Sequence, residues 1–151
     1  MIVSDSTTLI ILFDLKRLEL LSNLFEHIII PQAVYDEITV KNPIELTSFI
    51  SVRKVTHTEL FNTLTSLLDR GESEAIALAL ELDKPLIIDE KKGRKIALHQ
   101  GIKIIGLLGI VYLNIKKGYL TQTEAKDFLD NAREHGYRIS QKLIDEMFLK
   151  A

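Results

Sequence analysis

The sequence predicts an α/β domain layered around a mostly parallel sheet, and three observations lead to this prediction. Short segments rich in β-branched residues, such as His27–Ile30, alternate with longer segments of helical spacing. Apolar residues make up 46% of the chain, which excludes a disordered protein. A length of 151 residues favours a single domain, over residues 1–151, with a substantial core.

The first half of the chain contains three predicted strands, over residues 1–5, 27–30 and 51–55. Predicted helices cover residues 6–21 with a break near Asp14, 31–40 with Pro31 at the first position, and 58–68. Ser6 or Thr7 is expected to cap the first of these helices. Asn42 and Pro43 begin a further helix-start pattern.

The second half continues the alternation, with predicted strands over residues 86–88 and 102–105. Predicted helices cover residues 74–82, 91–100, 106–117, 121–134 and 140–149. Gly101 is expected to end its helix in a left-handed conformation, and Gly118 follows the end of the next one. Thr121 and Glu124 have the spacing of a capping box.

Composition excludes several classes of protein. No apolar run reaches the ~20 residues that a membrane helix needs, and the N-terminus carries no export signal. Cysteine is absent, which excludes disulfides and thiolate metal sites and suits a reducing cytoplasm, where we expect the protein. A net charge of −2 gives no global signature of nucleic-acid binding, so contacts to RNA require a local basic patch.

Acidic residues lie at the predicted ends of several elements. Glu72 and Glu74 open one helix, Asp89 and Glu90 follow a buried strand, and Asp5 ends the first strand. Each acid also has an ordinary structural explanation, as a helix cap or a solvated side chain. In a parallel sheet, however, such positions meet at the carboxyl edge, where ligands bind. Carboxylates gathered there repel one another and need protons, basic partners or a metal ion.

Five segments in the same order resemble the PIN-domain family: VSDSTTLIIL, IIIPQAVYDEI, GESEAIALAL, LIIDEKKGRKIA and IKIIGLLGIVYLNIKKGYL. They are similar in particular to its compact subgroup with the GExEA and DExxGR signatures, which is related to the toxin ribonucleases of toxin–antitoxin pairs. The resemblance covers nearly the whole chain. It implies a three-layer α/β/α sandwich and a metal-dependent ribonuclease site of three or four acids.

The resemblance also implies the residues of that site. In the order of the family's acids, the matching positions are Asp5, Glu37, Glu74 and Asp89. Glu90 is the alternative to Asp89, which we prefer because it directly follows the strand, and Glu72 is a further alternate. Ser6 or Thr7 matches a small hydroxyl that supports the metal site in the family.

Mg²⁺, or Mn²⁺ in its place, is the expected cofactor, because hard cations prefer carboxylate oxygens. We predict that Asp5 and Asp89 hold the ion directly, and that Glu37 and Glu74 bind it through water or place a second ion. The ion would polarise the scissile phosphate of RNA and activate a water for in-line attack, and the sequence is compatible with one or two ions.

A dense basic cluster follows the last of these acids and is predicted to contact the RNA phosphates: Lys91, Lys92, Arg94 and Lys95. A solvated helix face balanced by Glu90 is the alternative explanation for this cluster.

The resemblance implies a homodimer and allows a small antitoxin protein as a partner, with no role for a membrane. Apolar surface on residues 9–25 and on the C-terminal helix exceeds the need of one small sheet, and in that helix it comprises Leu143, Ile144, Met147 and Phe148. The alternative function is a PIN-like module that binds nucleic acid or protein without catalysis, since the third acid is Glu where many relatives have Asp. A phosphohydrolase with Asp5 as nucleophile is a weaker alternative, because Thr7 occupies the place of the expected second acid.

Overall fold

The computed structural model describes residues 1–40 and 45–151. In these residues, five strands form one parallel sheet in the order β3-β2-β1-β4-β5. The strands are β1 (Ile2–Ser4), β2 (Ile28–Pro31), β3 (Ile50–Arg53), β4 (Leu86–Ile87) and β5 (Ile104–Ile105). The predicted parallel sheet is therefore confirmed.

The helices of the described residues alternate with these strands. Up to the fourth strand they are α1 (Ser6–Asp14), α2 (Glu19–Ser22), α3 (Gln32–Thr39), α4 (Glu59–Thr65) and α5 (Arg70–Leu82). After it they are α6 (Lys91–His99), α7 (Leu107–Lys116), α8 (Gln122–Glu134) and α9 (Gln141–Lys150). The predicted break near Asp14 is confirmed, because α1 ends there and the chain turns before α2.

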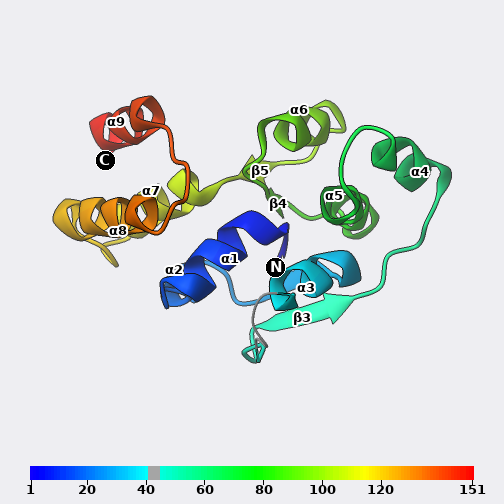
Figure 1. The fold of residues 1–151 in the computed structure, drawn as a ribbon, viewed down its shortest axis with the longest axis horizontal. Coiled ribbons are helices and arrows are strands. Elements are labelled where there is room, and N and C mark those ends of the chain that lie inside the picture. Colours follow the sequence, from blue (N-terminus) through cyan, green and yellow to red (C-terminus); the bar gives the residue numbers. More distant parts are fainter. Residues whose placement is uncertain (41–44) are drawn as a thin grey trace.

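Two apolar cores lie on opposite faces of the sheet, because successive strand residues point to opposite sides. Ile2, Ile28 and Ile30 face a core that includes residues of α1, α2, α3, α7, α8 and α9. Val3, Ile29 and Leu86 face a second core with residues of α4, α5 and α6. In Figure 1, α7 to α9 lie on the left and α4 to α6 on the right. The chain is thus the α/β/α sandwich that was predicted.

Strand β1 occupies the centre of the sheet and determines where a site can form. The chain moves outward from β1 through β2 to β3, and then returns to place β4 on the other side of β1. The carboxyl ends of β1 and β4 therefore flank the point where the strand order reverses, which is where open α/β sheets bind ligands. The backbone N–H of Asp5, just after β1, donates to the Ile87 carbonyl of β4 at 2.9 Å.

The first residues of three helices differ from the positions that the sequence predicted. The N-cap residue of α1 is Asp5 rather than Ser6 or Thr7, and its side chain makes no cap hydrogen bond. Pro31 ends β2 and precedes α3, one residue before its predicted place inside the helix. Helix α5 begins at Arg70, four residues before the predicted start, because the Asp69 carboxylate accepts the N–H of Glu72 at 2.8 Å.

The other predicted caps have mixed outcomes. The capping box of Thr121 and Glu124 is present at the start of α8. Gly101 and Gly118 both have a φ of +82°, the left-handed conformation expected after a helix. The pattern at Asn42 and Pro43 lies outside the described residues, and no helix follows it in residues 45–49.

The C-terminal helix α9 uses most of its apolar residues inside the chain. Ile144 and Met147 are buried in the core under α7 and α8, and Phe148 packs against the same core. Leu143 and Leu149 remain exposed. The surplus of apolar surface that favoured a dimer is therefore smaller than the sequence indicated. Among the described residues, no helix has both the length and the apolar character needed to cross a membrane.

Candidate active site at an acidic edge

Five carboxylates lie near one another at the carboxyl edge of the sheet, and we call this group the acidic edge. Its members come from four parts of the chain: the end of β1, helix α3, the first turn of α5 and the segment after β4. They are Asp5, Glu37, Asp69, Glu72 and Asp89. The parallel sheet brings the segments together because all its strands end on the same side.

Asp5 is the buried centre of the acidic edge. Its side chain is only 4% exposed, and its Oδ1 oxygen has no hydrogen-bond partner among the described residues. Burial raises the pKa of Asp5 from 3.8 to about 7, because it penalises the charged form. A hydrogen bond from the Ser6 backbone lowers the pKa, and the negative charges of Glu37, Asp69 and Asp89 raise it. Within residues 1–40 and 45–151, no cation is among the groups that shift the pKa of this carboxyl.

Glu72 is the second buried acid of the group. It is 8% exposed, and its Oε2 oxygen also has no hydrogen-bond partner in the described part of the chain. Burial, followed by the adjacent Asp69 and then by Asp5, raises the pKa of Glu72 from 4.5 to about 8. The absence of a side chain at Gly93 leaves room for this carboxylate, since a Cβ there would lie 2.7 Å from Oε2.

Glu37 and Asp69 form the exposed side of the acidic edge. The Ser6 hydroxyl donates to Glu37 Oε2 at 2.6 Å, which ties α3 to the start of α1. Both acids approach the backbone of Gly71, where a Cβ would collide with Glu37 Oε1 and lie 3.6 Å from Asp69 Oδ1. A glycine at this position therefore allows the two carboxylates to converge.

Asp89 is held at the acidic edge by hydrogen bonds, and the negative charge of its neighbour Glu90 also raises the pKa of Glu72. Asp89 Oδ1 accepts the backbone N–H of Leu107 at 2.9 Å, and the Thr8 hydroxyl donates to Asp89 Oδ2. Glu90 is exposed and caps α6 by accepting the N–H of Gly93 at 2.9 Å. Asp89 could have been the N-cap of α6 from its position in the sequence, but Glu90 is the N-cap in the structure.

Glu74, which we predicted among the metal-binding acids, has polar protein partners of its own in the structure, and its role in catalysis remains a prediction. It is 2% exposed, and its carboxylate contacts the N–H of Ala33 at 3.0 Å, His57 Nε2 at 3.1 Å and Arg70 Nε at 3.4 Å. Glu72 and Glu74 point in opposite directions, because two residues two positions apart on a helix are rotated by about 200°. Glu72, the alternate, occupies the direction of the acidic edge.

Sequence reasoning missed Asp69 and Thr8. Asp69 lies three residues before Glu72, which is the spacing of an N-cap residue and its N3 acid, and this signal could have identified it. Thr8 contacts Asp89, whereas Thr7 is exposed and points elsewhere, so of the two predicted hydroxyls only Ser6 contacts an acid of the group. The catalytic roles of all these residues remain predictions.

The whole chain, including this acidic edge, matches a known protein family. A family model described as a PIN domain matches residues 1–151. The chain belongs to the PIN-domain family. The match confirms the resemblance seen in the sequence, and it covers every element that contributes to the acidic edge. A comparison with curated proteins finds no significant match.

Membership in the PIN-domain family assigns a nuclease-type fold to this chain. Proteins of this family are generally nucleases. In this PIN domain, the acids offer only oxygen donors, which are the ligands that Mg²⁺ and Mn²⁺ prefer.

The acidic edge fits a divalent cation in its chemistry. In the described part of the chain, Asp5 Oδ1 and Glu72 Oε2 are buried oxygens without hydrogen-bond partners, and the acids around both carboxyls raise their pKa values. Within residues 1–40 and 45–151, no three acids or histidines are gathered closely enough to enclose an ion. The donors are therefore present at this edge, in an arrangement that is more open than a finished coordination shell.

The two raised pKa values predict how stability depends on pH. Asp5 and Glu72 keep their protons in the folded protein at pH values where the unfolded chain has lost them, because their pKa values rise from 3.8 and 4.5 to about 7 and 8. The folded state then binds more protons, so the free energy of unfolding falls as the pH rises through this window. We expect urea unfolding in chelator to give lower stability at pH 8 than at pH 5.5.

A double variant provides the control for this pH dependence. Asp5→Asn with Glu72→Gln removes both titrating groups and keeps their shapes, so its stability should vary less with pH than that of the wild type. Parallel pH profiles for the two proteins would contradict the assignment of the raised pKa values to these carboxyls.

Proposed function

We propose that this PIN domain is a divalent-metal-dependent ribonuclease that hydrolyses phosphodiester bonds. One observation carries the proposal: at the carboxyl edge of the sheet, Asp5 Oδ1 and Glu72 Oε2 are both buried and have no hydrogen-bond partner among residues 1–40 and 45–151. Buried carboxylates are normally paired or bound to a metal. Elsewhere in the described residues, the buried Glu74 does have polar partners.

The residues of the acidic edge divide into three roles. Asp5 and Glu72 would hold the ion through their unpaired oxygens, and a bound ion would polarise the scissile phosphate and lower the pKa of a water. Asp89 is oriented by Thr8 and by the Leu107 N–H. Glu37 and Asp69 lie at the exposed side and would bind through water.

The assignment departs from the sequence prediction in three respects: Glu72 takes the place of Glu74, Asp69 is added, and Asp89 no longer holds the ion directly. Asp89 was expected to hold the ion directly together with Asp5, but both of its oxygens already have protein donors. We therefore propose that Glu72 binds the ion directly and that Asp89 lies beside it without direct contact to the ion. RNA as the substrate, a small antitoxin partner and a homodimer belong to the same proposal and are supported by the family resemblance.

A cleavage assay tests the proposed function. Purified protein is incubated with a labelled single-stranded RNA in Mg²⁺, in Mn²⁺ or in chelator, and we expect cleavage only with the divalent ions. In parallel, Mn²⁺ at about 100 times its dissociation constant should stabilise the protein by ~2.7 kcal/mol in thermal unfolding at pH 8. Cleavage in chelator would contradict a metal mechanism. RNA binding without turnover, together with no stabilisation by Mn²⁺, would indicate the binding module instead.

A further inference from the structure

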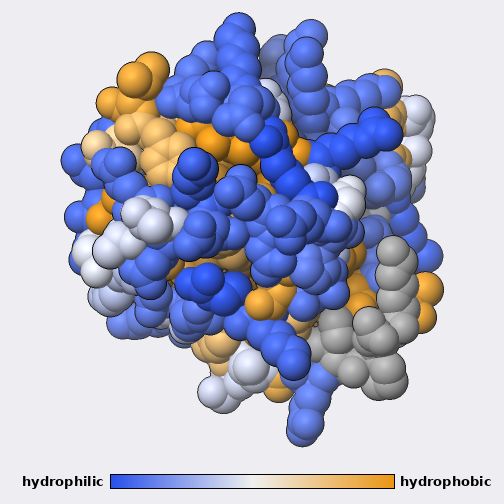
Figure 2. Space-filling view, turned by 60° about the vertical axis from the view of Figure 1, so that its left-hand side comes forward, coloured by the Kyte–Doolittle hydropathy of each residue, from blue (hydrophilic) through white to orange (hydrophobic). Residues whose placement is uncertain are grey.

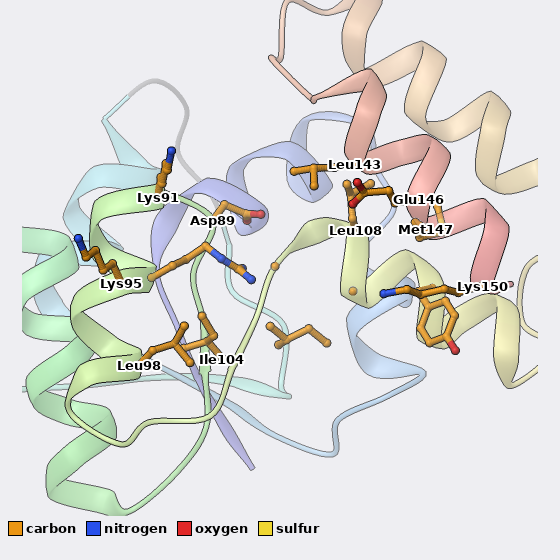
Figure 3. Close-up of a pocket in the computed structure, with 15 residues that line it drawn as sticks. Asp89, Lys91, Lys95, Leu98, Ile104, Leu108, Leu143, Glu146, Met147 and Lys150 are labelled. Carbon is orange, nitrogen blue, oxygen red and sulfur yellow. The ribbon is translucent and has the colours of Figure 1, made fainter.

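A groove beside the acidic edge is the second notable feature of this surface. It has a volume of about 1160 Å³ and runs between α6 on one wall and α9 on the other, over β5 and the start of α7. Figure 3 shows Lys91 and Lys95 on one side, Leu143, Glu146 and Lys150 on the other, and Asp89 between them. The groove therefore begins at a member of the acidic edge.

The walls of the groove carry more positive than negative charge. Four cations line it: Lys91, Arg94 and Lys95 from α6, and Lys150 from α9. Glu146 is its only acid among the described residues apart from Asp89. Lys91 and Lys95 are four positions apart and so share one face of α6. In a protein of net charge −2, this is a local concentration of positive charge directly beside the proposed site.

The floor of the groove is apolar. Ile104, Leu108 and Met147 line it, and Leu98 and Leu143 lie at its rims with 58% and 52% of their surface exposed. Tyr112 provides an aromatic ring. Figure 2 shows apolar surface between hydrophilic side chains on the face that carries the C-terminal helices. A duplex hides the faces of its bases, whereas an unpaired strand exposes them to apolar and aromatic side chains.

We propose that this groove holds the unpaired RNA segment that flanks the scissile phosphate, with its phosphates on Lys95 and Lys150 and a base against Tyr112. The proposal rests on the proposed function, because it takes RNA as the substrate. It adds a second region of contact, built jointly by α6 and the C-terminal helix, that sets the length and the single-stranded state of the substrate. Lys92 does not line the groove, so only three of the four predicted cations take part.

Binding measurements test the groove separately from cleavage. The probe is a fluorescein-labelled 12-nucleotide oligouridine, measured by anisotropy in Mg²⁺ with the Asp5→Asn chain so that no cleavage occurs. Lys95→Ala and Lys150→Ala should each weaken binding about 3- to 10-fold and each lower the salt slope of log Kd by ~0.7, because each removes one phosphate contact. Tyr112→Leu should weaken binding about 10-fold through loss of base stacking.

A control on the same helix makes the result specific. Lys142 is exposed on α9 and does not line the groove, so Lys142→Ala should keep both the affinity and the salt slope. Equal effects from Lys142→Ala and Lys150→Ala would overturn the proposal, as would a duplex of the same length that competes equally well. A polyglutamate peptide is tested in the same way. If the groove variants lose binding of this peptide while their RNA binding stays unchanged, the groove binds an acidic protein segment and the proposal is wrong.

The groove and the nuclease function can fail independently. If the variants weaken RNA binding as expected but no metal-dependent cleavage is ever found, the groove still binds unpaired RNA, but the proposed function is wrong and the groove does not flank a scissile phosphate. If cleavage depends on metal but the groove variants bind and cleave like the parent chain, the groove proposal alone is wrong.

Discussion

Asp5→Asn is expected to lower metal-dependent cleavage of RNA by about 10³-fold or more, equivalent to ~4 kcal/mol of transition-state stabilisation. Asparagine has nearly the shape of aspartate, but it lacks the negative charge and the second anionic oxygen needed to hold a divalent cation. The same substitution should raise the free energy of unfolding at pH 8 by about 1–2 kcal/mol in chelator, because it removes a buried charge surrounded by other acids. Cleavage rates under single turnover and urea unfolding measure the two effects.

The opposite signs of these effects distinguish a functional acid from a structural one. Asp130→Asn is a matched control, since Asp130 is exposed on α8 and lies outside the acidic edge, and it should change neither quantity. A variant that loses stability in parallel with activity would indicate that Asp5 supports the fold, and the metal site would have to be sought elsewhere.

Glu74→Ala is expected to destabilise the protein by about 3 kcal/mol, a loss of roughly 6–12 °C in Tm. The change removes a buried carboxylate that joins α3, α5 and the segment before α4 through the Ala33 N–H, Arg70 and His57. His57 also stacks on Phe61, with ring centroids 4.1 Å apart, so its position depends on both contacts. Thermal and urea unfolding at pH 7 measure the loss.

Glu72→Gln is the matched comparison on the same helix. Glu72 lacks polar partners on one oxygen, so its neutralisation should leave stability unchanged or raise it at pH 8, while cleavage falls about 10²-fold. Glu74→Ala, measured well below its Tm, should keep most of the cleavage rate. The reverse pattern, with Glu74 essential for cleavage and dispensable for stability, would return Glu74 to the site and remove Glu72 from it.

Residues at strand ends could be predicted from the sequence because the fold places them by a simple rule. Asp5 and Asp89 follow buried β-branched strands, and parallel strands end at a common edge, so their convergence required only the correct fold class. Glu37 depended on the resemblance to the family, since nothing in the pattern of α3 separates it from a solvated acid.

The choice between Glu72 and Glu74 could not be made from periodicity. Residues 71–79 of α5 are all buried, so the helix has no polar face to indicate which direction points toward solvent or toward the acidic edge. The groove could not be predicted from the sequence either, because helices far apart in the chain form its two walls. Lys91 and Lys95 could be assigned to one face of a helix, but Lys150 joins them only because α9 packs beside α7.

The close approach of carboxylates to Gly71 and Gly93 limits how this surface can diversify over evolution. A single methyl group at either position would occupy space that a glutamate oxygen now fills, and would push that oxygen away. Acid-to-amide exchange at the edge preserves volume, whereas a Cβ at either glycine would require a neighbouring side chain to move. An amide substitution would therefore change the charge of the edge and keep its shape, whereas a substitution at Gly71 or Gly93 would keep the charge and reposition a carboxylate.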